Sequence, residues 1–261
     1  MENLYQHFRE NEKQFIDQVL DWLHQVESHY APYLSPFLDP REQYIVESLL
    51  GQFPEVESKG YGGYEAAERK RLFFYPPYFE PQQDDFQIEI VEVRYPKKFA
   101  ELSHGKILGT LMGAGIKRET IGDIITDGDR WQFITETSIM PFLLTSVEKI
   151  GNIAVQLEET PYTDILIPKD TWEEHSEIVS SLRLDTVLSG VFNVSRQRSK
   201  ELIAAGKVKV NWNETDRPDV VLDIYDIISI RGYGRIRVQS IEGKTKKEKI
   251  RLNLGVLDRN K

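Results

Sequence analysis

The side chains best able to do chemistry in this chain are two basic residues on a short predicted helix. Arg196 and Lys200 are four residues apart and share one helix face, where like charges repel by roughly a few tenths of a kcal/mol. Ser195 can cap the start of this helix, and the free amides of the first turn suit a phosphate group. A bound polyanion would offset the repulsion, so the pattern predicts a phosphate-binding helix.

Other cationic and polar side chains extend this surface through residues 181–261. The residues that we expect to contact a nucleic acid are Arg183, Ser195, Arg196, Arg198, Lys200, Lys207, Lys209, Asn211, Arg231, Arg235, Lys244, Lys246 and Lys247. For any one of them taken alone, a solvated position on a small domain is the simpler interpretation. As a set, they predict a basic binding face.

Two short helices and a small sheet must position these side chains. Apolar residues recur at helical spacing over residues 182–191. A second helix carries Leu202 and Ile203 inward and ends at Gly206, which tolerates the left-handed conformation that follows a helix. The alternation of charged and apolar residues over 207–210 predicts a strand with one buried face.

The end of the chain predicts a hairpin. Apolar residues alternate with polar ones over 236–241 and recur over 250–254, and the connecting turn carries Lys244, Lys246 and Lys247. These lysines could bind phosphate or could protect an exposed sheet edge.

Charge is unevenly distributed along the chain. The net charge is −9, yet residues 180–261 carry 17 Lys and Arg against 10 Asp and Glu, whereas residues 1–179 have a net charge of −16. Phosphates would be attracted to one end and repelled by most of the other. We therefore expect an RNA-binding end joined to an acidic body that could meet a protein partner.

The sequence lacks the residues that several classes of function require. The chain has no cysteine, five scattered histidines, no GxSxG or HExxH motif, and no phosphate-binding loop; the glycines of 113–118 do not fit the dinucleotide pattern. We expect no catalytic residue, no metal site and no cofactor. The N-terminus lacks a signal peptide and no apolar run could span a bilayer, so we expect a cytoplasmic protein without membrane insertion.

Residues 1–80 predict a helical module with a glycine-rich loop and a proline-containing linker. One amphipathic helix should cover residues 12–30, and a second should run from Pro40 to Gly51. After the glycines of 60–63, we expect a loop whose residues Arg69, Lys70 and Arg71 are candidates for a secondary RNA contact. Prolines 76, 77 and 81 place a domain boundary near residue 80.

Residues 81–165 show a β-α-β-β-α-β order of periodicities, which is typical of ferredoxin-like and RNA-recognition (RRM-like) folds. Phe86, Trp131 and Phe133 could stack bases, although aromatic residues on strands more often belong to a core. Residues 166–180 are expected to form a linker with a helical stretch, followed by an RNA-binding domain over 181–261. The predicted fold class is α+β.

The final domain resembles a known RNA-binding unit, the S4 domain. The resemblance rests on Arg183-Leu184-Asp185, Ser195-Arg196, Leu202-Ile203, Gly206, Val208, Val210-Asn211 and Asp226-Ile228. It implies that Arg183, Ser195, Arg196, Lys200 and Lys207 contact structured RNA and that Asp185 and Asp226 are structural. Trp212 stands where that family commonly has glycine, so we expect an altered turn.

Over its full length the chain resembles the YlmH family of bacterial RNA-binding proteins. The matching segments are residues 5–8 (YQHF), 37–43 (FLDPREQ), 63–64 (GY), 67–71 (AERKR), 95–96 (YP), 107–112 (ILGTLM), 115–118 (GIKR) and 180–185 (SSLRLD). The resemblance implies a non-enzymatic factor that binds rRNA and tRNA of the large ribosomal subunit. It further implies a role in ribosome-associated quality control of obstructed subunits that still carry peptidyl-tRNA.

Two alternatives stay open at this point. S4 domains also accompany RNA-modifying enzymes, such as pseudouridine synthases and methyltransferases, although no matching catalytic motif stands in this sequence. A scaffold linked to cell division is implied by the gene neighbourhood of the family and by no residue of this chain.

Overall fold

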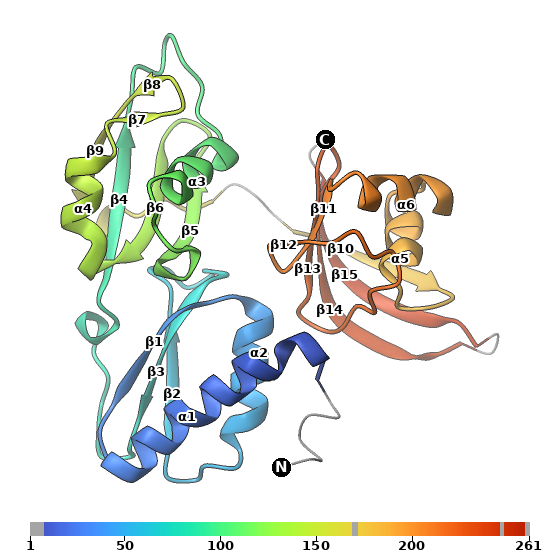
Figure 1. Ribbon diagram of the computed structural model, residues 1–261, viewed down its shortest axis with the longest axis horizontal. Helices are drawn as coiled ribbons and strands as arrows, with labels where there is room; N and C mark the ends of the chain where they lie inside the picture. Colours follow the sequence, from blue (N-terminus) through green and yellow to red (C-terminus); the bar gives the residue numbers. More distant parts are fainter. Residues whose placement is uncertain (1–7, 169–171, 246–247, 259–261) are drawn as a thin grey trace. The chain divides into compact units, whose positions relative to one another are not determined.

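The computed structural model describes residues 8–168, 172–245 and 248–258. They form two compact units that divide between residues 169 and 170. Both units combine helices with antiparallel sheets, so the predicted α+β class is confirmed (Figure 1). None of the described helices has the length and apolar character needed to cross a lipid bilayer.

The first unit begins with the two helices that the sequence predicts. A short 3-10 helix, η2 (Glu10–Glu12), leads into α1 (Lys13–His29), and α2 (Pro40–Leu50) has proline at its first position. The Asp39 carboxylate accepts a 2.9 Å hydrogen bond from the Glu42 amide, and the Glu42 carboxylate accepts one of 2.7 Å from the Asp39 amide. This reciprocal cap fixes where α2 begins.

The N-terminal module also contains a three-stranded sheet that the sequence did not predict. Strands β1 (Tyr33–Leu38), β2 (Glu57–Tyr61) and β3 (Lys70–Tyr75) lie in the order β1-β3-β2. The glycines and basic residues that we expected in one loop therefore lie partly in strands: Gly60 is in β2, and Lys70 and Arg71 are in β3. Because β3 is buried on both faces, it lacks the alternation that marks a half-buried strand.

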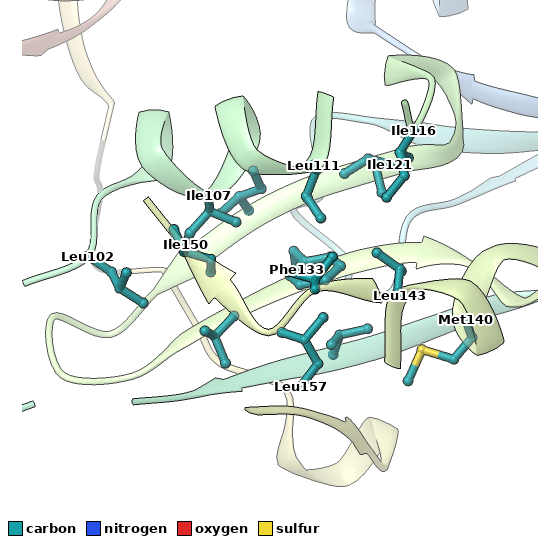
Figure 2. Close-up of a cluster of buried hydrophobic side chains, with 14 of the residues drawn as sticks. Leu102, Ile107, Leu111, Ile116, Ile121, Phe133, Met140, Leu143, Ile150 and Leu157 are labelled. Atoms are coloured by element: carbon teal, nitrogen blue, oxygen red, sulfur yellow. The ribbon is translucent and has the colours of Figure 1, made fainter. Parts of the chain in front are cut away.

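The middle of the chain has the predicted β-α-β-β-α-β order. Its elements are β4 (Ile88–Arg94), α3 (His104–Gly113), β5 (Ile121–Thr126), β6 (Trp131–Glu136), α4 (Met140–Ser146) and β9 (Gln156–Thr160). The sheet order is β5-β6-β4-β9. In Figure 2, Ile107 and Leu111 of α3 and Leu143 of α4 surround Phe133 of β6, and all four are buried.

Smaller elements differ from the prediction. The second helix of this order, α4, ends at Ser146 and is followed by a short hairpin of β7 (Lys149–Ile150) and β8 (Ile153–Ala154), which the predicted order does not contain. The remaining 3-10 helices of this unit are η3 (Gln83–Phe86), η4 (Arg118–Thr120), η5 (Thr137–Ile139) and η6 (Tyr162–Asp164).

The N-terminal module packs against part of the middle sheet on the face opposite α3 and α4. Phe37 and Phe73 of the first sheet share one buried cluster with Ile88 and Ile134 of the second. RNA-recognition domains stack bases on this face of their sheet. In this protein the part of that face around Ile88 and Ile134 packs against the N-terminal module and Leu166.

The structure contradicts base stacking by two of the three sheet aromatics of the middle domain, Phe86 and Phe133. Phe133 is 0% exposed within the helix-side core, and Phe86 is 2% exposed within the interface. Trp131 is half-buried and packs against the helix-side core. Burial removes the surface that a base would need on Phe86 and Phe133, whereas Trp131 keeps part of its surface exposed.

Arg69 and Arg71 join the two sheets of the first unit. The Arg69 guanidinium donates to the carbonyls of Phe37 at 2.6 Å and Ile121 at 3.2 Å. The Arg71 guanidinium donates to the carbonyl of Ser35 at 2.9 Å and also to those of residues 86 and 87. The expected RNA contact is therefore not retained for these two buried arginines, and Lys70 stands between them, half-buried, in β3.

The second unit is a six-stranded antiparallel sheet with two helices, α5 (Leu184–Val191) and α6 (Arg196–Ala204). The strands are β10 (Glu173–Val179), β11 (Val208–Val210), β12 (Asn213–Glu214), β13 (Ile227–Ile230), β14 (Gly234–Lys244) and β15 (Ile250–Asp258), in the order β10-β15-β14-β13-β11-β12. The predicted C-terminal hairpin is confirmed as β14 and β15. Apolar residues of α5 and α6 share one core with the sheet.

One prediction for this unit is wrong. The helical stretch expected within the 166–180 linker is strand β10, which pairs with β15 from Glu173 opposite Val256 to Val179 opposite Ile250. Most of β10 is exposed, so its sequence offers little apolar pattern of either period. Its backbone hydrogen bonds to β15 decide the conformation.

The cap of α2 predicts a pH-dependent stability. Burial, together with the neighbouring Asp39 carboxylate, raises the pKa of Glu42 to about 7 from an ordinary value of 4.5. The stability that the protonated Glu42 carboxyl contributes is fully present below its ordinary pKa of 4.5 and is lost as the pH rises through about 7. Glu42→Gln keeps an oxygen acceptor without the charge. Its free energy of unfolding relative to wild type should therefore rise between about pH 5 and pH 8, by at most about 3 kcal/mol.

Urea unfolding across that pH range measures this difference. Glu47→Gln is the matched control, because Glu47 is exposed on the same helix and should show no such trend. Parallel pH profiles for wild type and Glu42→Gln would contradict the prediction.

Candidate nucleic-acid interface

The central feature of the candidate interface is one buried carboxylate that holds two arginines. Asp185, in the first turn of α5, has a side chain that is 0% exposed. Its Oδ1 accepts from Arg183 Nε at 3.1 Å and its Oδ2 from Arg196 Nε at 3.0 Å. The Nη2 atoms of the two arginines add contacts of 3.3 and 3.4 Å. Because Arg183 precedes α5 and Arg196 begins α6, the carboxylate fixes both guanidiniums where the helices meet.

The two arginines favour the ionised form of the Asp185 carboxylate. Burial alone would raise the pKa of Asp185, but the hydrogen bonds from Arg183 and Arg196 outweigh it and hold the pKa below its ordinary value. The arginine side chains are 36% and 51% exposed, so both also reach solvent. Guanidiniums held in fixed positions at a surface are suited to bidentate recognition of phosphate.

The predicted cap of α6 is confirmed. The Ser195 hydroxyl accepts a 3.1 Å hydrogen bond from the Arg198 amide. Arg198 and Lys200 are exposed on α6, and Arg198 also pairs with Glu201 at 3.0 Å. The charge of Arg196 is compensated by Asp185, which offsets part of the repulsion from Lys200. We call Arg183, Arg196, Arg198 and Lys200 the helix face.

Two further candidates lie together after α6. Gly206 takes the predicted left-handed conformation, with φ +65°, and the Lys207 amide donates to the carbonyl of Leu202 at 3.1 Å. The Arg231 amide donates to the carbonyl of Lys207 at 2.8 Å, which joins the two basic residues by their backbones. Both side chains are exposed. They add cationic charge at the C-terminal end of α6.

Asn211 has a structural function instead of the expected RNA contact. Its Nδ2 donates to the buried Asp226 carboxylate at 2.9 Å, and its Oδ1 accepts from the Ile227 amide at 2.9 Å. With φ values of +48° and +64°, Asn211 and Trp212 form the two-residue turn between β11 and β12. This is the turn in which the sequence places tryptophan instead of glycine, and two positive φ values are typical of such hairpins.

Other candidates do not join the helix face. Lys209 alternates on β11 with Val208 and Val210, whose side chains are buried under the helices, so Lys209 points to the opposite side of the sheet. Arg235 lies on that same side, since its neighbour Ile236 is in the core. Lys244 ends β14; its side chain, together with Lys246 and Lys247, lies outside the described residues.

The expected basic surface is therefore divided between two faces of the unit. Sequence reasoning also missed Arg237 and Trp172, which lie beside Arg235. The alternation of basic and apolar residues along β14 could have placed Arg237 on the same face as Arg235. No local pattern could have found Trp172, because it precedes β10 and contacts Arg235 only in the folded structure. Across residues 8–168, 172–245 and 248–258, no group of three or more His, Asp or Glu side chains is placed to hold a metal ion.

Family models match three parts of the chain. Residues 11–79 match the model described as "YlmH, N-terminal", residues 81–164 match "Putative RNA-binding domain in YlmH", and residues 182–228 match "S4 domain". The last match contains the helix face.

Two similar proteins extend these matches. The chain is 42% identical over 252 residues to the ribosome-associated protein quality control protein P2 of Bacillus subtilis (strain 168), which covers 97% of this chain and 98% of the relative. It is also similar to the solved structure called cell division protein ylmH from Streptococcus pneumoniae. That match has a TM-score of 0.55 and 35% identity, and covers 62% of this chain and 99% of the other.

The carboxylate between the two arginines predicts a measurable loss of stability. Asp185→Asn leaves two guanidiniums without their charged partner, and both reach solvent, so we expect a loss of about 1–3 kcal/mol near neutral pH. A carboxylate with a lowered pKa stabilises the fold above its ordinary value of 3.8, and this stabilisation disappears as the pH falls. The free energies of unfolding of wild type and Asp185→Asn should therefore become equal at acid pH.

Thermal unfolding over a pH series measures this effect. Asp216→Asn removes one exposed charge from the same unit and serves as the control. Equal stability of Asp185→Asn and wild type at neutral pH would show that the ion pairs do not stabilise the unit.

Proposed function

This chain belongs to the YlmH family of RNA-binding proteins, and we propose that it docks on structured rRNA and tRNA of the large ribosomal subunit. We propose further that it acts in quality control of obstructed subunits that carry peptidyl-tRNA, in the cytoplasm and without catalysis. The printed name of the B. subtilis relative, at 42% identity, supports the ribosomal part of this proposal.

One observation supports the docking surface above all others. Asp185 fixes Arg183 and Arg196, and these two residues and Lys200 stand at positions that the resemblance to S4 domains assigns to RNA contact, with Arg198 as a further exposed cation on α6. Such a surface recognises folded RNA by phosphate position and shape and needs no unpaired base. A large folded RNA such as rRNA presents phosphates in this manner.

The first unit has a different part in the proposal. Residues 1–169, which make up this unit, carry 16 Lys and Arg against 28 Asp and Glu, a net charge of −12, and two of the arginines are turned inward between the sheets. This surface would be repelled by phosphates and therefore would orient the basic unit toward RNA. We propose that it faces a protein partner or solvent in the bound state.

A link to cell division has one observation in its favour, the printed name of the similar S. pneumoniae structure. None of the residues that the structure describes gives further support for this link. A division defect in cells whose chromosomal copy carries a helix-face variant, without any change in ribosome association, would favour this second function.

The proposal predicts salt-dependent binding to large subunits through the helix face. If the unit neutralises about 4–6 phosphates, the logarithm of affinity should fall with the logarithm of salt concentration with a slope of roughly −3 to −5. Reversal of the charge of two exposed side chains, by Arg198→Glu together with Lys200→Glu, should abolish co-sedimentation with large subunits in sucrose gradients. Arg196 is left intact because its loss would also disturb Asp185.

The matched control is Lys13→Glu with Lys149→Glu, which makes the same charge change at exposed positions of the first unit. This control should co-sediment as wild type does. Unchanged co-sedimentation of the helix-face double variant, or equal loss in the control, would contradict docking through the helix face.

A further inference from the structure

Four side chains form an alternating series of indoles and guanidiniums on the sheet of the second unit. The guanidinium carbon of Arg235 lies 5.2 Å from the ring centre of Trp172 and 5.9 Å from that of Trp212. The guanidinium carbon of Arg237 lies 4.8 Å from the ring centre of Trp172. All four side chains are half-buried, so each keeps part of its surface in solvent. We call these four residues the aromatic ladder.

The aromatic ladder lies on the face of the sheet opposite the helices. Arg235 and Arg237 alternate on β14 with Ile236 and Val238, which are in the core under α5 and α6. Both described helices of this unit pack on that core side. The aromatic ladder is therefore a second surface, separate from the helix face.

Trp172 packs against a strand position that has no side chain. A Cβ atom at Gly255 would lie only 3.2 Å from Cε3 of Trp172, and Gly255 is paired with Arg237 in the sheet. The indole thus rests on the backbone of β15, beside the guanidinium of the adjacent strand. The sheet itself holds the ring in position.

Trp212 occupies a turn position that disfavours a bulky side chain. Its φ of +64° is the left-handed conformation, in which glycine, asparagine or aspartate is the usual residue. A tryptophan here is strained and adds one more ring to the same surface. Local strain of this kind is concentrated at ligand-binding sites.

We propose that the aromatic ladder binds unpaired RNA nucleotides, with bases stacked on the indoles and phosphates beside the arginines. Sheet aromatics that stack bases, combined with cationic side chains along the backbone path, are the common means of binding single-stranded RNA. Three of the ladder's four residues, Trp212, Arg235 and Arg237, belong to the part of the chain with excess positive charge, residues 180–261. Two acidic residues adjoin the aromatic ladder: Glu214, which is paired with Lys209 at 3.8 Å, and Glu174, which stands opposite Gly255 in the sheet.

RNA suits this surface better than an acidic peptide does. A peptide carboxylate would engage only the arginines, whereas a nucleotide supplies a phosphate for the arginines and also a planar ring for the exposed part of the indoles. The inference rests on the RNA-binding character of the chain and does not require that the RNA be ribosomal.

The test measures binding of a fluorescein-labelled oligoadenylate of about 12 nucleotides to the full chain by fluorescence anisotropy. Trp212→Gly deletes one indole, and because glycine suits the positive φ, the variant should fold at least as stably as wild type. Loss of one stacked base should weaken binding about 5- to 100-fold. Wild-type affinity in this variant would overturn the proposal.

Two comparisons separate stacking from charge. Arg237→Lys keeps the charge but removes the planar group beside Trp172, so it should also weaken oligoadenylate binding. A duplex RNA of the same length should bind Trp212→Gly as it binds wild type, since its bases are already paired. Equal losses for duplex and single strand would contradict stacking.

The helix-face double variant separates this proposal from the proposed function. The ratio of wild-type to Trp212→Gly affinities for oligoadenylate should persist when Arg198→Glu and Lys200→Glu are also present. Its disappearance in that background would show that the aromatic ladder has no binding role of its own. Co-sedimentation with large subunits reports on the helix face independently of this ratio.

Discussion

The second unit depends on the charge of one buried carboxylate. A carboxylate removed from water requires cationic partners, and Asp185 obtains them from the start of α5 and the start of α6. These helices have eight and nine residues, too few to be stable alone, so tertiary contacts must hold them. The ion pairs that help to hold the helices also place two guanidiniums at the surface. Stability and the proposed RNA recognition are thereby coupled at one residue.

The first unit uses arginines in the opposite way. Arg69 and Arg71 are buried and donate to backbone carbonyls of both sheets, so they satisfy polar groups that the interface would otherwise leave without partners. The same interface covers part of the face on which an RNA-recognition fold would stack bases. In our proposal, the position of the basic residues, more than their number, therefore decides which of them can meet RNA.

Much of the fold could be predicted from local signals. Asp39, Ser195 and Gly206 mark helix ends by their own chemistry, and the β-α-β-β-α-β order follows from periodicity. The strands that were missed lack such signals, because β3 is buried on both faces and β10 is mostly exposed. For the candidate site, the sequence supplied the residue types on α6. It could not show that Asn211 is engaged by Asp226, or that Lys209 and Arg235 point away from the helices, because those facts depend on tertiary contacts.

The central claim is that the basic unit, through the helix face, carries the contact with ribosomal RNA. The most direct measurement is ultraviolet cross-linking of the full chain to purified large subunits, followed by mass spectrometry of the peptides joined to RNA. The account predicts cross-linked peptides from residues 183–207, which contain α5, α6 and Lys207. Cross-links found exclusively in residues 8–168 would contradict it, because the acidic unit would then be the one in contact with RNA.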